Sequence, residues 1–277
     1  MEILLTSILL GACTGVVLAL TGAGGTIIAV PLLIFGLHLV IAEAAPIALL
    51  AVCLSSAAGA LFAHRQGKVR YRAAGFIAIT GVMTAPAGIW LAQKLPNVPL
   101  TILFALVLLY VAVDMLRQSK RQNDQAIAEV PDCRPRTSSI PCQLEYAGGR
   151  LIWTWPCARA LAFSGATAGF LSGLLGVGGG FAVVPALKKA TNLPMQSILA
   201  TSLAVIALIS LIGVTFAAIL GGMNWAIALP FSAGALTGML IGRIFAARLA
   251  GPKLQQGFAV VAMGVSVGMI IRLFWIT

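Results

Sequence analysis

The stretch Leu174-Leu175-Gly176-Val177-Gly178-Gly179-Gly180-Phe181 interrupts an apolar run with glycines, and Pro185 follows it. A similar break, Leu20-Thr21-Gly22-Ala23-Gly24-Gly25-Thr26 followed by Pro31, lies 154 residues earlier. The same offset pairs further residues without a gap: Gly11 with Gly165, Gly15 with Gly169, Ser56 with Ser210, Gly59 with Gly213, Gly67 with Gly221, Gly88 with Gly242 and Phe104 with Phe258. The sequence therefore predicts two copies of one unit.

Composition places the chain in a lipid bilayer. Of its 277 residues, 60% are hydrophobic and only 9% are charged, and the mean hydropathy is +1.03. Several uncharged runs reach about 20 residues, the length that crosses the hydrocarbon core, whereas a soluble protein has about a quarter of its residues charged. We predict an all-α polytopic membrane protein with a first repeat unit at 1–116, a polar linker with an interfacial tryptophan anchor at 117–157, and a second repeat unit at 158–277.

The other function classes find little support. Although the net charge is +11, the basic residues lie beside apolar runs and are interpreted as orientation signals, so no nucleic-acid partner is expected. The five cysteines form no CxxC pair and have no histidine at zinc spacing, so we expect no metal or other cofactor and ordinary free thiols. No paired acids, Ser-His couple or HExxH motif falls within a span, so we do not expect an enzyme.

The first apolar run is too long for one crossing. Residues 3–37 would form a helix of about 50 Å against a hydrocarbon core of about 30 Å. The break at Gly22 must therefore give either a discontinuous, tilted span or a re-entrant hairpin. In each unit three ordinary spans follow the broken element: 44–63, 73–93 and 100–113, then 195–220, 225–242 and 254–271.

The distribution of basic residues separates the two alternatives. If both broken elements re-enter, the second unit is inverted, and 16 of the 18 Lys and Arg residues lie on one side. If both cross, only 12 of them share a side. The positive-inside tendency favours the first arrangement, so we expect inverted repeats with Met1 and Thr277 outside and residues 64–72, 117–159 and 243–253 in the cytoplasm.

The doubled break is also the candidate substrate site. Glycines allow unusual backbone conformations and close approach, and the N–H groups that begin the next half-helix attract anions. Two other interpretations stay open: the glycines permit close helix packing, and the hydroxyls bond back to their own helices. The candidate binding residues are Thr21, Gly22, Gly24, Gly25, Thr26, Ser56, Gly176, Gly178, Gly179, Gly180, Thr201, Ser202 and Ser210.

Three charged residues near span ends are candidates for gating or coupling. Arg243 directly follows Gly242 and is close enough to the interface to reach it with its long side chain. Glu43 and Asp114 are the only acids close to spans, and protons are a candidate coupling ion. The alternative is that both acids face water.

The two breaks with their prolines, together with Ala200-Thr201-Ser202-Leu203 before Ser210 and Gly213, give the chain a recognisable pattern. It resembles the sulfite exporter TauE/SafE family of bacterial inner-membrane permeases. The resemblance implies a multi-pass inner-membrane transporter that exports sulfite, sulfoacetate or another organosulfonate, and it is compatible with a homo-oligomer. A non-transporting membrane scaffold or assembly factor is the alternative. The first copy has Ala45-Pro46-Ile47-Ala48-Leu49 where the second has Leu199-Ala200-Thr201-Ser202-Leu203, so we expect fewer donors on its side.

Overall fold

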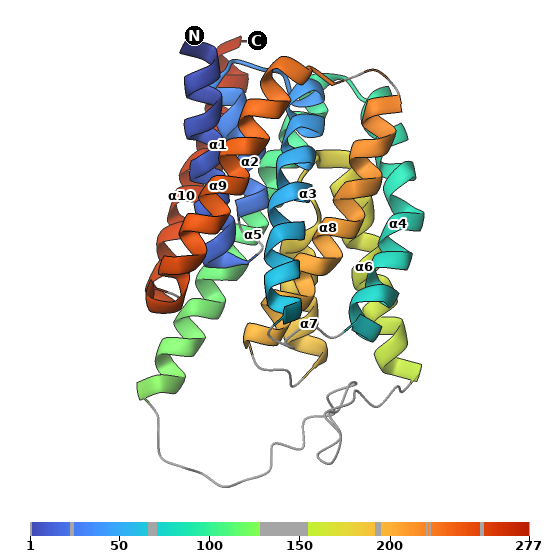
Figure 1. The fold of residues 1–277 in the computed structure, drawn as a ribbon, viewed down its shortest axis with the longest axis vertical. Coiled ribbons are helices and arrows are strands. Elements are labelled where there is room, and N and C mark those ends of the chain that lie inside the picture. Colours follow the sequence, from blue (N-terminus) through green and yellow to red (C-terminus); the bar gives the residue numbers. More distant parts are fainter. Residues whose placement is uncertain are drawn as a thin grey trace, which may run out of the picture.

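The computed structural model describes residues 2–22, 25–65, 71–127, 155–191, 195–219, 221, 223–249 and 252–276. These residues form ten helices that pack as one bundle (Figure 1). The helices are α1 (Glu2–Thr21), α2 (Gly25–Gly36), α3 (Ile41–Arg65), α4 (Tyr71–Lys94), α5 (Asn97–Ile127), α6 (Trp155–Leu175), α7 (Gly180–Ala190), α8 (Met195–Ile219), α9 (Trp225–Leu249) and α10 (Pro252–Ile276). The predicted all-α class is confirmed.

Helix length and surface composition confirm a polytopic membrane protein. Within the described ranges, seven helices are long and apolar enough to cross a membrane: α1, α3, α4, α5, α6, α8 and α9. Large apolar side chains cover the outside of the bundle, and Met83, Phe163 and Ile219 are 78%, 74% and 81% exposed. Such a surface is unsuited to water and fits contact with lipid.

The glycine break turns the chain back on itself. Gly25, which begins α2, lies directly against the backbone of Leu18 in α1, so closely that a methyl group there would clash. Gly36, which ends α2, lies beside the side chain of Leu10 in the same way. Because α2 thus runs back along α1, the first broken element is a hairpin rather than a discontinuous crossing helix. Helices α6 and α7 also pack against each other.

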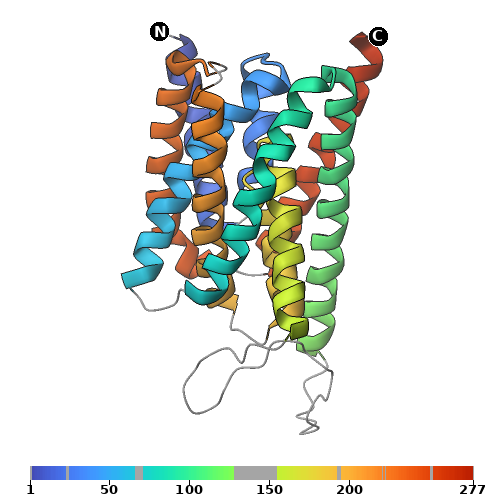
Figure 2. The same cartoon turned by 90° about the vertical axis from the view of Figure 1, so that its right-hand side faces the viewer.

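The two hairpins open toward opposite ends of the bundle. Both termini lie at one end, where α1 begins and α2 ends (Figures 1 and 2). The end of α3, the end of α5 and the start of α6 lie at the other end, and α7 ends there too. The ends of the described helices that flank the basic 64–72 loop and the linker are therefore remote from the termini.

The main helix pairs join one unit to the other. Helix α1 packs on α9 and α6 packs on α4, while α3 packs on α8 and α5 packs on α10. In the 154-residue offset, α6 is the equivalent of α1 and α9 is the equivalent of α4, so the α1–α9 pair and the α6–α4 pair are equivalent to each other. In the α3–α8 pair and in the α5–α10 pair, a helix packs on its own equivalent. The units are interlocked through these contacts and do not form separate hydrophobic cores.

Small residues bring the crossing helices together at equivalent positions. Gly15 on α1 lies against the carbonyl group of Ala235 on α9, and Gly169 on α6 lies against the carbonyl group of Gly81 on α4. Ala235 and Gly81 are themselves 154 residues apart. Without a side chain at Gly15 and Gly169 the helix backbones can approach closely, as small residues allow in membranes. Packing therefore explains these two glycines.

Helix α5 continues to Ile127, into the segment that the sequence predicts to be a polar linker. Extending an existing helix adds a hydrogen bond for each residue fixed, without a new nucleation step. A helix that is already formed in the membrane can therefore extend into the polar residues that follow it.

Candidate functional site

The second break consists of glycines with left-handed backbone. The φ angles of Gly176, Gly178 and Gly179 are 71°, 70° and 69°, a region that side-chain-bearing residues occupy only with strain. Gly179 is the N-cap of α7, and the break is buried. The glycines therefore let the chain stop one helix and start the next inside the protein, where the first N–H groups of α7 have no partner within the helix.

The first break has a matching geometry where the structure describes it. Gly22 has a φ of 73° and lies against Leu199 on α8, while Gly176 lies against Ala45 on α3. Leu199 and Ala45 are 154 residues apart, so each break contacts the equivalent position of the other unit. Gly24 lies outside the described residues.

Most of the candidate hydroxyls donate to their own helices. Four such bonds run from Thr21 Oγ1 to Val17 O at 2.7 Å, from Ser56 Oγ to Val52 O at 2.5 Å, from Thr201 Oγ1 to Ser197 O at 2.6 Å and from Ser202 Oγ to Leu199 O at 2.8 Å. Thr26 is fully buried at the start of α2. These four hydroxyls therefore bond back to their own helices, which is one of the two alternatives to a binding role. To bind substrate, they would have to break these hydrogen bonds.

Ser210 is different from the other predicted hydroxyls. It is fully buried, and its Oγ has no hydrogen-bond partner. A methyl group at Gly178 would lie 2.9 Å from Ser210 Oγ and 3.0 Å from Val52 Cγ1. The structure thus brings the second break, α8 and the middle of α3 together around an unpaired donor.

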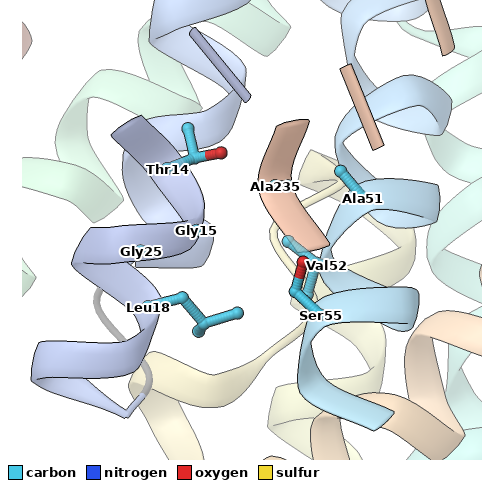
Figure 3. Close-up of a pocket in the computed structure, with 8 residues that line it drawn as sticks. All are labelled: Thr14, Gly15, Leu18, Gly25, Ala51, Val52, Ser55 and Ala235. Carbon is cyan, nitrogen blue, oxygen red and sulfur yellow. The ribbon is translucent and has the colours of Figure 1, made fainter. Parts of the chain in front are cut away.

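A second unpaired hydroxyl lies on α3. Ser55 Oγ is fully buried without a partner, and it lines a small pocket together with Thr14, Gly15, Gly25 and Ala235. Figure 3 shows the Ser55 and Thr14 oxygens on the two sides of this pocket. Its volume of about 10 Å³ is near the minimum for one water molecule.

Sequence reasoning selected Ser56 and missed its neighbour Ser55. Ser56 is the predicted residue because it pairs with Ser210 across the repeat, but in the structure Ser56 Oγ donates to Val52 O. The Ser55-Ser56 doublet was the available signal. Which of the two faces the pocket depends on how α1 and α9 pack on α3, and a single helix sequence does not contain that information.

Of the three charged candidates, two make defined contacts. Arg243 Nη1 donates to the carbonyl oxygen of Gly59 at 3.0 Å, and its guanidinium lies 5.2 Å from the centre of the Phe62 ring. Burial lowers the pKa of Lys188 in α7, while the nearby negative charge of Asp114 raises it, so Asp114 lies close to a cation. Glu43 is exposed in the first turn of α3.

Cysteine and acidic side chains form no metal centre in the described part of the chain, where no group of three or more His, Cys, Asp and Glu could hold an ion. Cys13 and Cys53 are free thiols. Cys157 is disulfide-bonded, so the expectation of a free thiol is wrong for that residue, because sequence spacing does not show which cysteines meet in space.

These features define a polytopic membrane protein whose two buried hairpins meet inside one helical bundle. The family model for the sulfite exporter TauE/SafE matches residues 7–269. The chain therefore belongs to the sulfite exporter TauE/SafE family.

Two curated relatives are also similar along most of the chain. A probable membrane transporter protein of Xylella fastidiosa (strain Temecula1 / ATCC 700964) is 30% identical over 274 residues, covering 95% of this chain and 93% of the relative. The probable membrane transporter protein YunE of Bacillus subtilis (strain 168) is 24% identical, covering 85% of each chain. No solved structure matches the chain significantly. Family and relatives together indicate a membrane transporter.

Proposed function

We propose that this protein is a secondary transporter that exports a small anion such as sulfite, sulfoacetate or another organosulfonate. The substrate binds between two inverted units near the middle of the bilayer, and alternating access moves it across. The proposal places the protein in the inner membrane and is compatible with protons as the coupling ion and with a homo-oligomer.

The observation that carries the proposal is the reciprocal packing of the two breaks. Gly22 of the first unit lies against Leu199 of the second, and Gly176 of the second lies against Ala45 of the first. The two short helices that follow the breaks, α2 and α7, contact each other. Interrupted helices that meet between repeats are the usual substrate sites of secondary transporters, and their N-termini favour anionic groups.

The chemistry near the breaks suits an anion better than a cation. No carboxylate occurs after Glu145 in the sequence, so the second unit offers no acid to compensate a cation. Glycine N–H groups and buried hydroxyls supply hydrogen-bond donors without a formal charge. A charge-free donor set avoids the cost of burying an ion-paired residue in the membrane.

The small pocket beside Ser55 fits a conformation that is closed around the proposed site. A cavity with a volume of about 10 Å³ holds about one water, which is less than a whole sulfite or sulfonate requires. Transport then requires the two units to move relative to each other, and we expect that motion at contacts between the units such as α3 with α8.

Transport by the purified protein in liposomes tests the proposal. We expect uptake of radiolabelled sulfite or sulfoacetate into proteoliposomes, faster than into protein-free liposomes and competed by an excess of the same unlabelled anion. Transport of a metal cation, with no member of a broad anion panel moved, would refute the proposal. Normal folding without any transport or any stabilisation by an anion would favour a scaffold.

A further inference from the structure

The pocket between α1, α3, α9 and the start of α2 has an unused hydrogen-bond donor. Ser55 Oγ is fully buried and unpaired, and it lines the pocket that Thr14 faces from α1 (Figure 3). Thr14 Oγ1 donates to Gly11 O at 2.6 Å, so Ser55 is the hydroxyl with a hydrogen available for a ligand. A buried hydroxyl without a partner costs free energy, and its presence calls for an explanation.

The pocket also lies at the beginning of a half-helix. Gly25, the first residue of the 12-residue helix α2, is one of its lining residues. The first N–H groups of a helix have no intrahelical partner, and the helix dipole places positive potential at this end. A free hydroxyl and a helix N-terminus together favour an oxygen atom that carries negative charge.

The other unit carries apolar residues at the equivalent place. The 154-residue shift replaces Ser55 by Ile209 and Thr14 by Ala168. Ile209 and Ala168 are fully buried, and Ile209 packs onto Gly81, the equivalent of Ala235. Apolar side chains therefore lie in the second unit at the positions where the first unit has the hydroxyls of Ser55 and Thr14.

We propose that Ser55 marks a subsite for one oxygen of the transported oxyanion, with its polar groups supplied by the first unit and Ala235 of the second unit on its wall. This inference rests on the proposed function and makes it more specific. The sequence predicts fewer donors on the side of the first unit, and Ser55 adds one to that side: Thr201 and Ser202 donate to their own helix, whereas Ser55, like Ser210 of the second unit, donates to none. Ser55 and Ser210 are not repeat equivalents, so these two free hydroxyls are placed differently in the two units although the breaks pack at equivalent positions.

The test compares two serine-to-alanine variants of the full-length protein. Ser55→Ala removes the pocket donor. Ser232→Ala removes a hydroxyl on α9 that is equally buried and unpaired but does not line the pocket. Transport of sulfite and sulfoacetate into proteoliposomes is measured for both variants and for the unsubstituted protein, together with the thermal unfolding midpoint in detergent with and without each anion.

For Ser55→Ala we expect the KM for the oxyanions to rise about tenfold or more, because a hydrogen bond to a charged group is lost. Its unfolding midpoint without anion should be unchanged or higher, because an unpaired buried hydroxyl is removed, and stabilisation by the anion should shrink. Ser232→Ala should change neither KM nor the anion's effect. A Ser55→Ala protein with unchanged KM overturns the subsite, as does one that loses stability in proportion to transport.

Failure of the proposed function would look different from failure of the subsite. If the unsubstituted protein moved no anion, the proposed function would be refuted and the subsite with it. If the unsubstituted protein transported sulfite and both alanine variants matched it, the transporter would stand and only the subsite would be refuted.

Discussion

The thiol of Cys53 on α3 lies 3.7 Å from the carbonyl oxygen of Ala207 on α8, and these two residues are separated by 154 positions. Each is therefore the repeat equivalent of the other. Residues that contact their own equivalents lie close to the axis that would exchange the two units. The contacts of Gly59 with Leu203 and of Gly213 with Leu49 correspond in the same way on the two sides of this point.

A disulfide across this contact should stop transport. In the Ala207→Cys variant the new thiol lies next to Cys53, and oxidation with copper phenanthroline should link α3 to α8 if the Cα atoms are within disulfide range. If the two units move relative to each other at this axis, the cross-linked protein is fixed in one state. We expect transport to fall to the background of protein-free liposomes and to return with reductant, while peptide mapping identifies the cross-link.

Two controls make the cross-link experiment decisive. The Ala207→Ser variant is similar in size but cannot cross-link, so oxidation should leave its transport unchanged. Full transport by a quantitatively cross-linked protein would show that α3 and α8 do not move apart during the cycle, which contradicts rocking at this axis.

The topology prediction concerns which end of the bundle faces the cytoplasm. We expect Met1 and Thr277 to face outward, because 16 of the 18 basic residues then lie inside. An alkaline-phosphatase fusion at Thr277 should be active, and a green fluorescent protein fusion there should be dark. Cys157 at the start of α6 is disulfide-bonded, and disulfides are rare in the cytoplasm. If that disulfide faces outward, the orientation is reversed, and the phosphatase fusion would be inactive and the fluorescent fusion bright.

Arg243 should act on the rate of transport more than on affinity. Its hydrogen bond to the Gly59 carbonyl and its contact with the Phe62 ring join α9 to α3, and the repeat equivalent of Arg243 is Ile89. For Arg243→Met we expect a loss of about 1–2 kcal/mol in unfolding free energy and a lower maximal rate with unchanged KM, since a contact made in one state sets its population.

Lys94 provides the comparison for Arg243. Its ammonium lies 4.0 Å from the centre of the Trp90 ring, but the pair is exposed and should contribute little. Lys94→Met should therefore retain both stability and transport. An Arg243→Met protein that loses stability but transports at the normal rate would assign Arg243 a purely structural role.

The sequence predicted the helical class and the two breaks, because glycine and proline positions limit the backbone directly. Glycine permits the positive φ found at Gly22 and Gly176. The length of the run left a hairpin and a discontinuous span open, and the distribution of basic residues favoured the hairpin. Sequence reasoning did not find Ser55, because the choice between Ser55 and Ser56 is made by packing from α1 and α9. Nor could it show that Thr201 donates to Ser197 O, since a hydroxyl's partner depends on side-chain rotation.

The glycines of the second break differ in whether backbone or side-chain atoms lie next to them, and the sequence alone does not show this difference. Gly179 is one of the binding residues predicted from sequence, so Gly179→Ala is an obvious variant with which to test a ligand-facing tip. In the structure a methyl group at Gly179 would lie 2.5 Å from the backbone oxygen of Ala168 on α6, so this variant should lose stability and transport together. Gly178 is the better position, because the groups near its methyl are side chains, including Ser210 Oγ.

Gly178→Ala and Gly221→Ala form a matched pair that separates strain from site. Both glycines have a φ of 70°, so alanine should cost each about 1–2 kcal/mol of backbone strain. Nothing lies within 4 Å of a methyl group at Gly221, whereas at Gly178 it would lie 2.9 Å from Ser210 Oγ and 3.0 Å from Val52 Cγ1. We expect loss of sulfite transport in Gly178→Ala only, with a larger loss of thermal stability than in Gly221→Ala because the methyl group must displace its neighbours.

Gly213→Ala completes this comparison with a glycine inside a helix. A methyl group there would lie 3.0 Å from Leu49 Cδ1, the end of a flexible side chain that can move, and alanine also favours the helix by up to about 1 kcal/mol. Stability and transport should both stay near those of the unsubstituted protein. Transport and unfolding midpoint are measured at matched expression for all three variants. If Gly178→Ala transports as well as Gly221→Ala does, the second break serves the turn between α6 and α7 and does not bind the anion.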